Sequence, residues 1–228
     1  MLIGGFQKMT MLDYPTKIAC TIFTHGCNLR CPFCHNARLV INEPDLIDEN
    51  EILSYINKRR GVLDGVCISG GEPMLQCDLF DFMKKVKDMG MFIKLDTNGC
   101  FPDKLSKAIS SGLVDYVAMD IKNCREKYAQ TVGLEKLDIS KIEKSVEILM
   151  SGKVDFEFRT TVTKELHTPA DFIKIGEWIK GNEKYYIQGF IDSGELIKSG
   201  SSPLDNQGLK ALLEAVLPYV PNTSLRGI

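Results

Sequence analysis

The sequence predicts an α/β protein in which six βα units surround a parallel sheet. Short β-rich runs alternate with amphipathic helical segments along almost the whole chain. This alternation is typical of parallel strands joined by right-handed crossovers, with the helices outside the sheet. The 228 residues suit one α/β domain better than two. The hydrophobic share of 44% and the charged share of 25% are those of a globular protein, and they exclude disordered, collagen-like and coiled-coil chains.

Six β-rich runs are the predicted strands. The first, residues 17–24, leads directly into a cluster of cysteines, and the second, residues 66–69, leads into a glycine-rich turn. The remaining four strands are predicted at residues 92–96, 116–120, 155–162 and 185–190. Because a helical segment follows each run, all six strands are expected to lie parallel.

Helices with recognisable ends follow these strands. Asp48 and Glu51 have the spacing of a capping box, and the helix that they begin stops near Gly61. Thr168 is a cap with Pro169 at the first helical position. Further helices are predicted at residues 79–90, 103–111, 140–149 and 207–217. Six such units can close partly into a barrel or lie open as a doubly wound sheet, and the periodicity leaves both possible.

One domain is expected over residues 1–228, because no Pro/Ser-rich linker divides the chain. Within it, residues 1–16 are assigned to an N-terminal extension, residues 17–190 to the core βα units, and residues 191–228 to a C-terminal loop and helix. No side-chain pattern repeats at a fixed period beyond the βα alternation itself.

Charge and hydropathy exclude several classes of partner. The net charge of −2 gives no general attraction to nucleic acid or to an anionic membrane. No apolar run reaches the ~18 residues of a membrane helix, and residues 1–10 lack the basic and apolar parts of a secretion signal. We therefore expect a cytoplasmic protein that has neither nucleic acid nor a membrane as its partner.

Polar or glycine-rich motifs follow four successive predicted strands. Cysteines follow the first strand, Gly70–Pro73 follows the second, Asp96–Gly99 the third and Asp120–Lys122 the fourth. The carboxyl ends of parallel strands lie at one edge of the sheet, where the chemistry of α/β proteins gathers. A random scatter of polar residues would not choose the same end of successive strands, so we expect these four loops to form one site.

Three of the eight cysteines are clustered, with Cys27, Cys31 and Cys34 spaced four and three residues apart. This spacing lets one loop wrap around a metal centre. Structural zinc sites and electron-transfer four-iron clusters take four protein ligands, so three thiolates leave one iron of a cubane cluster open to a substrate. The alternative is zinc bound by the three cysteines together with His25 or His35. The scattered cysteines are interpreted as core or incidental thiols: Cys20, Cys67, Cys77, Cys100 and Cys124.

The Cys-x3-Cys-x2-Cys cluster after the first strand resembles the signature of the radical S-adenosylmethionine (SAM) superfamily, and Gly70–Pro73 resembles its glycine-rich loop. The resemblance implies a partial, open parallel barrel that holds a [4Fe-4S] cluster and SAM. The three cysteines would bind the cluster, and the backbone of Phe33 would lie against the adenine. Gly70 and Gly71 would let the main chain pair with the methionyl amine, for which Glu72 offers an acceptor.

More narrowly, the segments around Cys34, Asp96 and Asp120 resemble those of glycyl-radical-enzyme activases. That family implies a site for a monovalent cation beside SAM, and Asp96, Thr97 and Asp120 occupy its positions. Lys122 matches the lysine that faces the methionyl carboxylate. Outside the three cysteines, the implied cofactor-binding residues are Phe33, His35, Gly70, Gly71, Glu72, Asp96, Asp120, Lys122 and Arg159.

The resemblance also implies a reaction. A reduced [4Fe-4S] cluster would donate an electron to SAM, releasing methionine and a 5′-deoxyadenosyl radical that takes hydrogen from a glycine of a partner enzyme. Flavodoxin or ferredoxin would supply the electron. The chain length and segments 3–8 and 13–15 are most similar to the activases of anaerobic ribonucleoside-triphosphate reductase, which is therefore the expected partner. Gln188 is a departure, because pyruvate formate-lyase activases carry a ribose-contacting histidine in this region.

Three alternatives stay open. An activase of the pyruvate formate-lyase kind would differ only in its partner. A radical enzyme that acts on a small molecule, such as 7-carboxy-7-deazaguanine synthase, would share the cluster and the fold. A zinc-stabilised binding module would keep the cysteine loop but contain zinc in place of iron.

Overall fold

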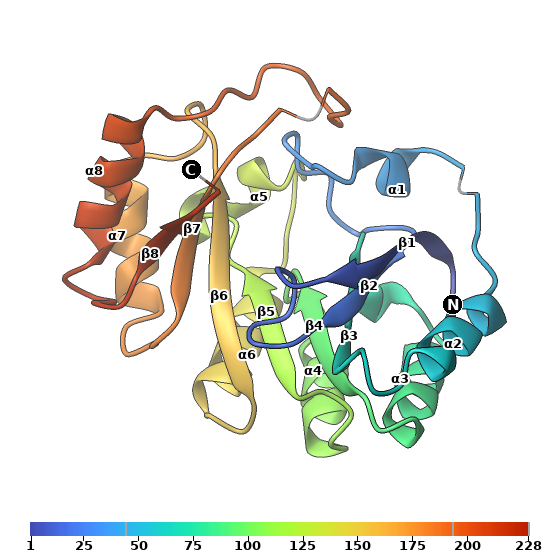
Figure 1. Cartoon of the computed structure of the whole chain (residues 1–228). Coiled ribbons are helices and arrows are strands. Elements are labelled where there is room, and N and C mark those ends of the chain that lie inside the picture. Colours follow the sequence, from blue (N-terminus) through green and yellow to red (C-terminus); the bar gives the residue numbers. More distant parts are fainter. Residues whose placement is uncertain (44, 193, 228) are drawn as a thin grey trace.

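The computed structural model describes residues 1–43, 45–192 and 194–227. One eight-stranded sheet runs through it, with the strands in chain order from β1 to β8 (Figure 1). β1 is antiparallel to β2, and every later pair of neighbours is parallel. The strands are β1 (Ile3–Thr10), β2 (Ala19–Thr24), β3 (Gly65–Gly70), β4 (Phe92–Thr97), β5 (Tyr116–Asp120), β6 (Asp155–Val162), β7 (Tyr185–Gly189) and β8 (Ser224–Arg226).

The fold is the expected partial, open barrel. In the described part of the chain, the strands follow one another from β1 to β8 without the sheet closing back on itself. The six predicted strands are β2 to β7, and each lies within two residues of its expected bounds. Helices connect them on the outer side of the sheet (Figure 1), as right-handed parallel crossovers require.

The six predicted helices are also present, and two of them begin at the predicted caps. The Asp48 side chain accepts the amide of Asn50 at 3.0 Å, and Thr168 forms a capping box with Asp171. No helix in the described ranges is both long and apolar enough to cross a membrane. The helices are α1 (Ala37–Ile41), α2 (Glu49–Lys58), α3 (Leu79–Asp88), α4 (Pro102–Ser110), α5 (Tyr128–Thr131), α6 (Ile139–Met150), α7 (Pro169–Trp178) and α8 (Asn206–Val216), with short 3-10 turns η1 (Pro73–Leu75) and η2 (Arg125–Lys127).

Both edge strands lie outside the predicted core units. Residues 1–16 contain β1, which pairs with β2, and the C-terminal segment ends in β8, which pairs with β7. Two adjacent glycines, Gly4 and Gly5, and three consecutive exposed side chains at residues 7–9 leave β1 without the alternation of a half-buried strand. β8 has three residues, which is too short for a periodic signal.

Alternation along the strands separates an apolar outer face from a polar inner face. On β4, Ile93 and Leu95 belong to the hydrophobic core, whereas Lys94 and Asp96 form an ion pair. Successive side chains of a strand point to opposite faces, so the charged pair faces the inside of the barrel. The helices cover the other face, where Phe82 of α3 is completely buried. The interior of the barrel can therefore carry charged groups beneath a site.

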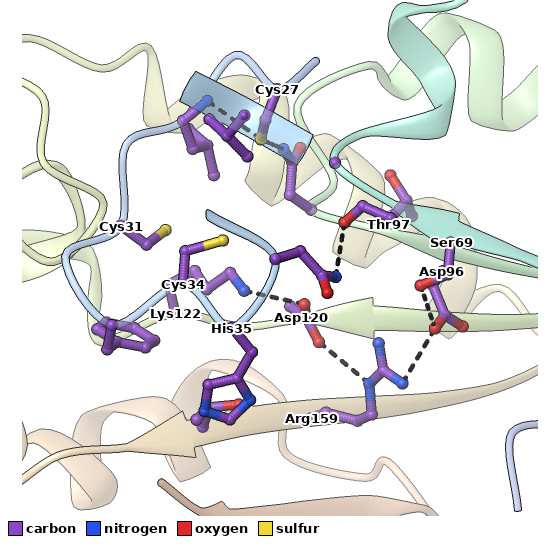
Figure 2. Close-up of a pocket in the computed structure, with 18 of the residues that line it drawn as sticks. Cys27, Cys31, Cys34, His35, Ser69, Asp96, Thr97, Asp120, Lys122 and Arg159 are labelled. Atoms are coloured by element: carbon purple, nitrogen blue, oxygen red, sulfur yellow. Dashed lines mark hydrogen bonds and ion pairs between the residues drawn. The ribbon is translucent and has the colours of Figure 1, made fainter. Parts of the chain in front are cut away.

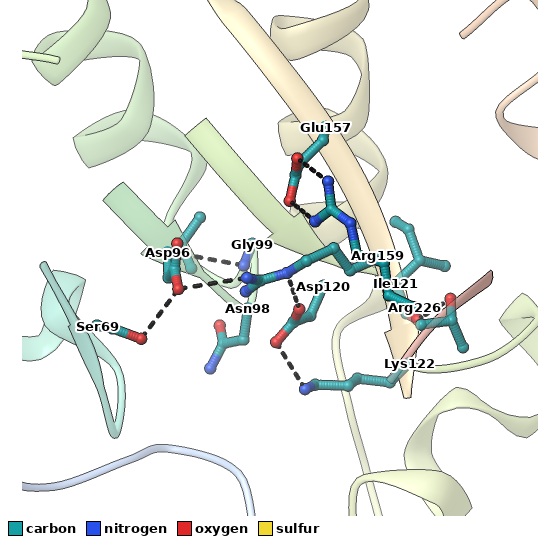
Figure 3. Close-up of polar contacts among 12 residues, drawn as sticks. Ser69, Asp96, Asn98, Gly99, Asp120, Ile121, Lys122, Glu157, Arg159 and Arg226 are labelled. Carbon is teal, nitrogen blue, oxygen red and sulfur yellow. Dashed lines mark hydrogen bonds and ion pairs between the residues drawn. The ribbon is translucent and has the colours of Figure 1, made fainter. Parts of the chain in front are cut away.

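An ion pair fastens the last strand to the sheet. The Arg226 guanidinium of β8 donates from Nη1 and Nη2 to the Glu157 carboxylate of β6, at 2.8 and 3.1 Å (Figure 3). Tyr116 donates its hydroxyl to the same carboxylate at 2.9 Å, and Arg226 stacks on the ring of Tyr186. Glu157 is 1% exposed, and a buried polar group must be satisfied by hydrogen-bonding partners such as these.

Replacing Arg226 with alanine should lower the free energy of unfolding by about 2–3 kcal/mol, because a buried carboxylate then loses its charged partner. The loss is measured by urea denaturation at neutral pH. The matched control is Arg125→Ala, since Arg125 also pairs with a glutamate, Glu143, and stacks on a ring, Trp178, but both charges are well exposed. The control should cost less than about 1 kcal/mol. Equal losses in the two variants would contradict the role given to Arg226.

Candidate functional site

A cavity of about 390 Å³ opens at the carboxyl ends of the strands (Figure 2). The loops after β2, β3, β4 and β5 all reach it, as the sequence predicts. It is lined by every residue that the resemblance assigned to the cluster, to SAM or to the cation except Glu72. These lining residues are Cys27, Cys31, Phe33, Cys34, His35, Gly70, Gly71, Asp96, Thr97, Asp120, Lys122 and Arg159.

The cysteine loop follows β2 and is tied to a distant segment by the backbone. The Arg30 amide donates to the carbonyl of Val132, just after α5, at 2.9 Å. Within the loop, the Cys34 amide donates to the carbonyl of Cys31 at 3.1 Å. Figure 2 shows the thiols of Cys31 and Cys34 directed toward the same space, with the Cys27 thiol across from them. The three sulfur atoms therefore border one cavity.

Burial favours the protonated form of these thiols. It raises the pKa of Cys27 to about 11 and that of Cys31 to about 12, while the nearby Lys122 ammonium acts in the opposite direction. Metals bind the thiolate, so loading the loop with iron must release protons.

The donor set fits an iron–sulfur cluster better than a single ion. Among the residues that the structure describes, no three His, Cys, Asp or Glu side chains are placed to hold one metal ion, as zinc with His25 or His35 would require. The His35 ring lies instead against Phe190, with 5.4 Å between the ring centroids. In a four-iron cluster each cysteine binds a different iron, and thiolate is the usual ligand. Three thiols around one cavity fit such a cluster with one iron left open.

The loop after β3 approaches the cysteine loop so closely that it requires glycine. The Gly71 amide donates to the Thr24 carbonyl at 2.9 Å, and the next amide, of Glu72, donates to the Gly26 carbonyl at 2.8 Å. A Cβ added to Gly71 would collide with the Gly26 carbonyl oxygen. Gly70 has a φ of 108°, which other residues rarely adopt. Any larger side chain here would push the two loops apart.

Glu72 does not face the cavity, which corrects the expectation that it offers an acceptor to the methionyl amine. Its carboxylate is completely buried and accepts from the Asn98 amide at 2.7 Å, the Thr97 hydroxyl at 2.9 Å and the Met74 amide at 3.0 Å. Burial raises the pKa of Glu72 to about 7, although these hydrogen bonds favour the ionised form. Glu72 instead ties the loop after β3 to the loop after β4.

Alternating charges form the cavity wall at the ends of β4 and β5 and on the adjacent part of β6 (Figure 3). Arg159 donates from Nε to Asp120 Oδ1 at 3.0 Å and from Nη1 to Asp96 Oδ2 at 3.3 Å. Lys122 donates to the other oxygen of Asp120 at 2.9 Å, and Ser69 donates to Asp96 at 3.0 Å. Burial alone would raise the pKa of Asp120, but Lys122 and Arg159 lower it to about 2, so the carboxylate stays ionised.

The three residues expected to bind a monovalent cation are engaged by the protein itself. Asp96 and Asp120 are paired with basic side chains, and Thr97 donates its hydroxyl to Glu72. In this arrangement the three residues do not fit a bound cation.

His167, which the sequence did not single out, supports two of the predicted residues. Its Nδ1 accepts the Thr163 amide at 3.1 Å, so Nε2 carries the proton and donates to the Lys122 carbonyl at 2.9 Å. Its ring lies edge-on to Phe33, with 6.2 Å between the centroids. Burial lowers the pKa of His167, which keeps the ring neutral. No local motif marks this residue, because only the folded chain brings it to Lys122.

Other residues reach the cavity from positions with weaker signals in the sequence. Asp13 lines it from the turn between β1 and β2, and Gln188 lines it from β7. Asn98, which also lines it, links two loops: its side-chain amide donates to Asn28 Oδ1 at 2.8 Å and lies 3.9 Å from the Cys27 sulfur. Asn98 belongs to the Asp96–Gly99 segment, so the sequence motif predicted that it lies near the site. The motif did not predict that Asn98 links two loops.

Several known proteins are similar to this chain in sequence. The radical SAM superfamily profile matches residues 21–179. A protein of Methanocaldococcus jannaschii, provisionally named a glycyl-radical enzyme activating enzyme, is 32% identical over 100% of this chain and 96% of its own length. The pyruvate formate-lyase-activating enzyme of Staphylococcus epidermidis is 32% identical over 78% of this chain and 74% of that enzyme. The chain therefore belongs to the radical SAM superfamily, within the group of glycyl-radical enzyme activating enzymes. Membership implies a [4Fe-4S] cluster and SAM.

Solved structures show the same fold at low sequence identity. A radical SAM methyltransferase from Sphaerobacter thermophilus has a TM-score of 0.75 at 11% identity, over 96% of this chain and 68% of that one. SuiB of Streptococcus suis, bound to SAM, has a TM-score of 0.70 at 15% identity, over 89% of this chain and 48% of SuiB. Identities this low support the fold alone.

Replacing Gly71 with alanine should weaken SAM binding by about tenfold or more, because overpacking here costs roughly 1–3 kcal/mol. The added methyl would collide with the Gly26 carbonyl and displace the glycine loop from the cysteine loop. Isothermal titration calorimetry on anaerobically reconstituted protein measures the affinity. Gly5→Ala is the control, since its methyl would make ordinary contact with Phe23. An unchanged affinity in the Gly71 variant would show that the loops do not need their close approach.

Proposed function

We propose that this protein activates a glycyl radical enzyme by abstracting hydrogen from a glycine of its partner, with a [4Fe-4S] cluster and SAM held in the cavity. The observation that carries this proposal is the convergence of Cys27, Cys31 and Cys34 with the glycine loop and Lys122 on one cavity. Three protein ligands leave one iron of a four-iron cluster open to a cofactor. The family match and the names of the relatives support the same function.

The residues around the cavity suit the charged ends of SAM. In this proposal Lys122 faces the methionyl carboxylate, and the backbone of Gly70 and Gly71 pairs with the methionyl amine. Burial alone would lower the pKa of Lys122, but Asp120 raises it, so the ammonium keeps its charge. Phe33 lies on the same wall and is proposed to border the adenine.

The protein binds, orients and shields the reacting groups. When bound, the cluster and SAM supply a one-electron reductive cleavage that generates the hydrogen-abstracting species. Leu29, Val40 and Ile197 complete the cavity wall with apolar side chains, which limits competing reactions with water. His167 holds the backbone of Lys122 in place through its hydrogen bond to the Lys122 carbonyl.

An open barrel suits a protein substrate. The sheet does not close between β1 and β8 in the described chain, so a glycine-bearing loop of another protein can approach the cavity. This step is an argument from the architecture alone.

The partner that we propose is anaerobic ribonucleoside-triphosphate reductase, with flavodoxin or ferredoxin as the electron donor in the cytoplasm. The similarity of segments 3–8 and 13–15 to the reductase activases supports this choice. Pyruvate formate-lyase is the second candidate, because the staphylococcal relatives at 32% and 34% identity bear that name. The monovalent cation is left out of the proposal, since Asp96 and Asp120 are already paired.

The direct test mixes anaerobic, reduced protein and SAM with each candidate partner in turn and records electron paramagnetic resonance spectra. The expected result is a glycyl radical on the reductase and none on pyruvate formate-lyase. A radical on pyruvate formate-lyase alone would show that this enzyme, and not the reductase, is the partner. Cleavage of SAM with no radical on either protein would overturn the activase function.

Cys31→Ala should abolish cluster binding, because the loop then supplies two thiolates instead of three. Cys77→Ala is the control, since Cys77 is exposed and lies outside the cavity lining. Iron content and the spectrum of the reduced cluster, recorded with and without SAM, report the outcome. Equal loss of iron in both variants would mean that the ligands are misassigned, and zinc in place of iron would favour the binding module.

A further inference from the structure

A buried lysine lies behind the charged wall of the cavity. Lys94 of β4 is 2% exposed, and its ammonium is paired with the Asp96 carboxylate on the same strand. The ammonium also lies 3.8 Å from the sulfur of Cys67 on the neighbouring strand β3. Lys94 is absent from the described residues that line the cavity, so direct contact with a ligand does not explain its burial.

We propose that the Lys94 ammonium supplies to the SAM site the positive charge that a bound monovalent metal ion would otherwise supply. It is a positioning residue, because it acts on the cavity through Asp96. With Asp96 neutralised by Lys94, the Arg159 guanidinium is shared with Asp120 without leaving either carboxylate unpaired. Because this charge belongs to the protein, SAM binding requires neither potassium nor sodium.

The oxygens that a cation would bind are already engaged. Lys94 donates to Oδ1 of Asp96, and Oδ2 accepts from Ser69 at 3.0 Å and from Arg159 at 3.3 Å. The two oxygens of Asp120 accept from Arg159 and Lys122, at 3.0 and 2.9 Å. A metal ion would have to displace these donors before it could reach the carboxylates.

The charges in this group agree with the role. Asp96 and Asp120 carry two negative charges, while Lys94, Arg159 and Lys122 carry three positive charges. The excess positive charge complements the methionyl carboxylate of SAM. Without Lys94 the group would be neutral, and Asp96 would keep only the Arg159 guanidinium, which it shares with Asp120, as a charged partner.

Lys94 keeps its charge in spite of its burial. Burial alone would lower the pKa of Lys94, but the Asp96 carboxylate raises it above its ordinary value. Burial would likewise raise the pKa of Asp96, but Arg159 and Lys94 lower it. The pair therefore stays ionised at neutral pH.

The first experiment uses the unaltered protein with its reconstituted cluster. SAM is titrated by isothermal titration calorimetry in potassium, sodium or tetramethylammonium chloride at equal ionic strength, so that screening is constant. The expected dissociation constants agree within about twofold. A constant about tenfold or more larger in tetramethylammonium than in potassium would overturn the proposal.

The second experiment removes the charge in two ways. Lys94→Ala leaves space for a small ion, so its SAM affinity should fall about tenfold in tetramethylammonium and recover in potassium or sodium. Lys94→Met fills the space, so its affinity should fall without recovery. Wild-type affinity of both variants in every salt would overturn the proposal. A loss in Lys94→Ala that no small cation restores would assign Lys94 a merely structural role and overturn it as well.

The matched control is Lys87→Ala. Lys87 of α3 is a partly buried lysine that pairs at 2.8 Å with Asp115, which lies just before β5 at the opposite end of the strands. This variant should have a lower melting temperature and salt-independent SAM binding. Neither experiment involves the glycyl radical partner, so their outcome is separate from the test of the proposed function.

Discussion

The Arg159 guanidinium, which bridges Asp96 and Asp120, is the interaction on which the rest of the site depends. It joins β6 to the ends of β4 and β5 and lets two carboxylates face one shielded cavity without mutual repulsion. A guanidinium is a rigid planar fork, so it fixes the separation of the two aspartates as well as their charge. The Lys122 ammonium donates to Asp120, so the position of Lys122 also depends on the bridge that Arg159 forms.

The loops around this bridge are held by contacts that leave little room for adjustment. Gly71 lies against the Gly26 carbonyl, and the Glu72 carboxylate accepts hydrogen bonds from the Asn98 amide and the Thr97 hydroxyl on the next loop. These contacts connect the cysteine loop, the glycine loop and the loop after β4 into one unit. A site whose supporting contacts are satisfied before ligand arrives loses less entropy on binding. Rigidity here comes from the backbone and buried polar groups, while the apolar core lies on the other face of the sheet.

The sequence was sufficient for the features that local patterns encode. Strands β2 to β7 and the six long helices have clear periodicity and caps, and the motifs at their ends located the cavity. The pattern could not show β8 or the glycine-containing edge strand β1. It also missed Lys94 and His167, because a lysine in a strand and a histidine in a loop have no local signal for burial. The motif containing Glu72 predicted the path of the loop, but it did not predict the direction in which the Glu72 side chain points.

The identity of strand order and chain order has a consequence for biosynthesis. Each strand pairs with the one synthesised before it, so the sheet can grow as the chain leaves the ribosome. The ion pair of Glu157 forms later than this pairing of neighbouring strands, because Arg226 lies 69 residues further along the chain. At roughly 5–20 residues per second, this interval lasts about 3–14 seconds. During that time the Tyr116 hydroxyl, which is synthesised before Glu157, can already donate to this carboxylate, and the charged partner arrives only when β8 joins the sheet.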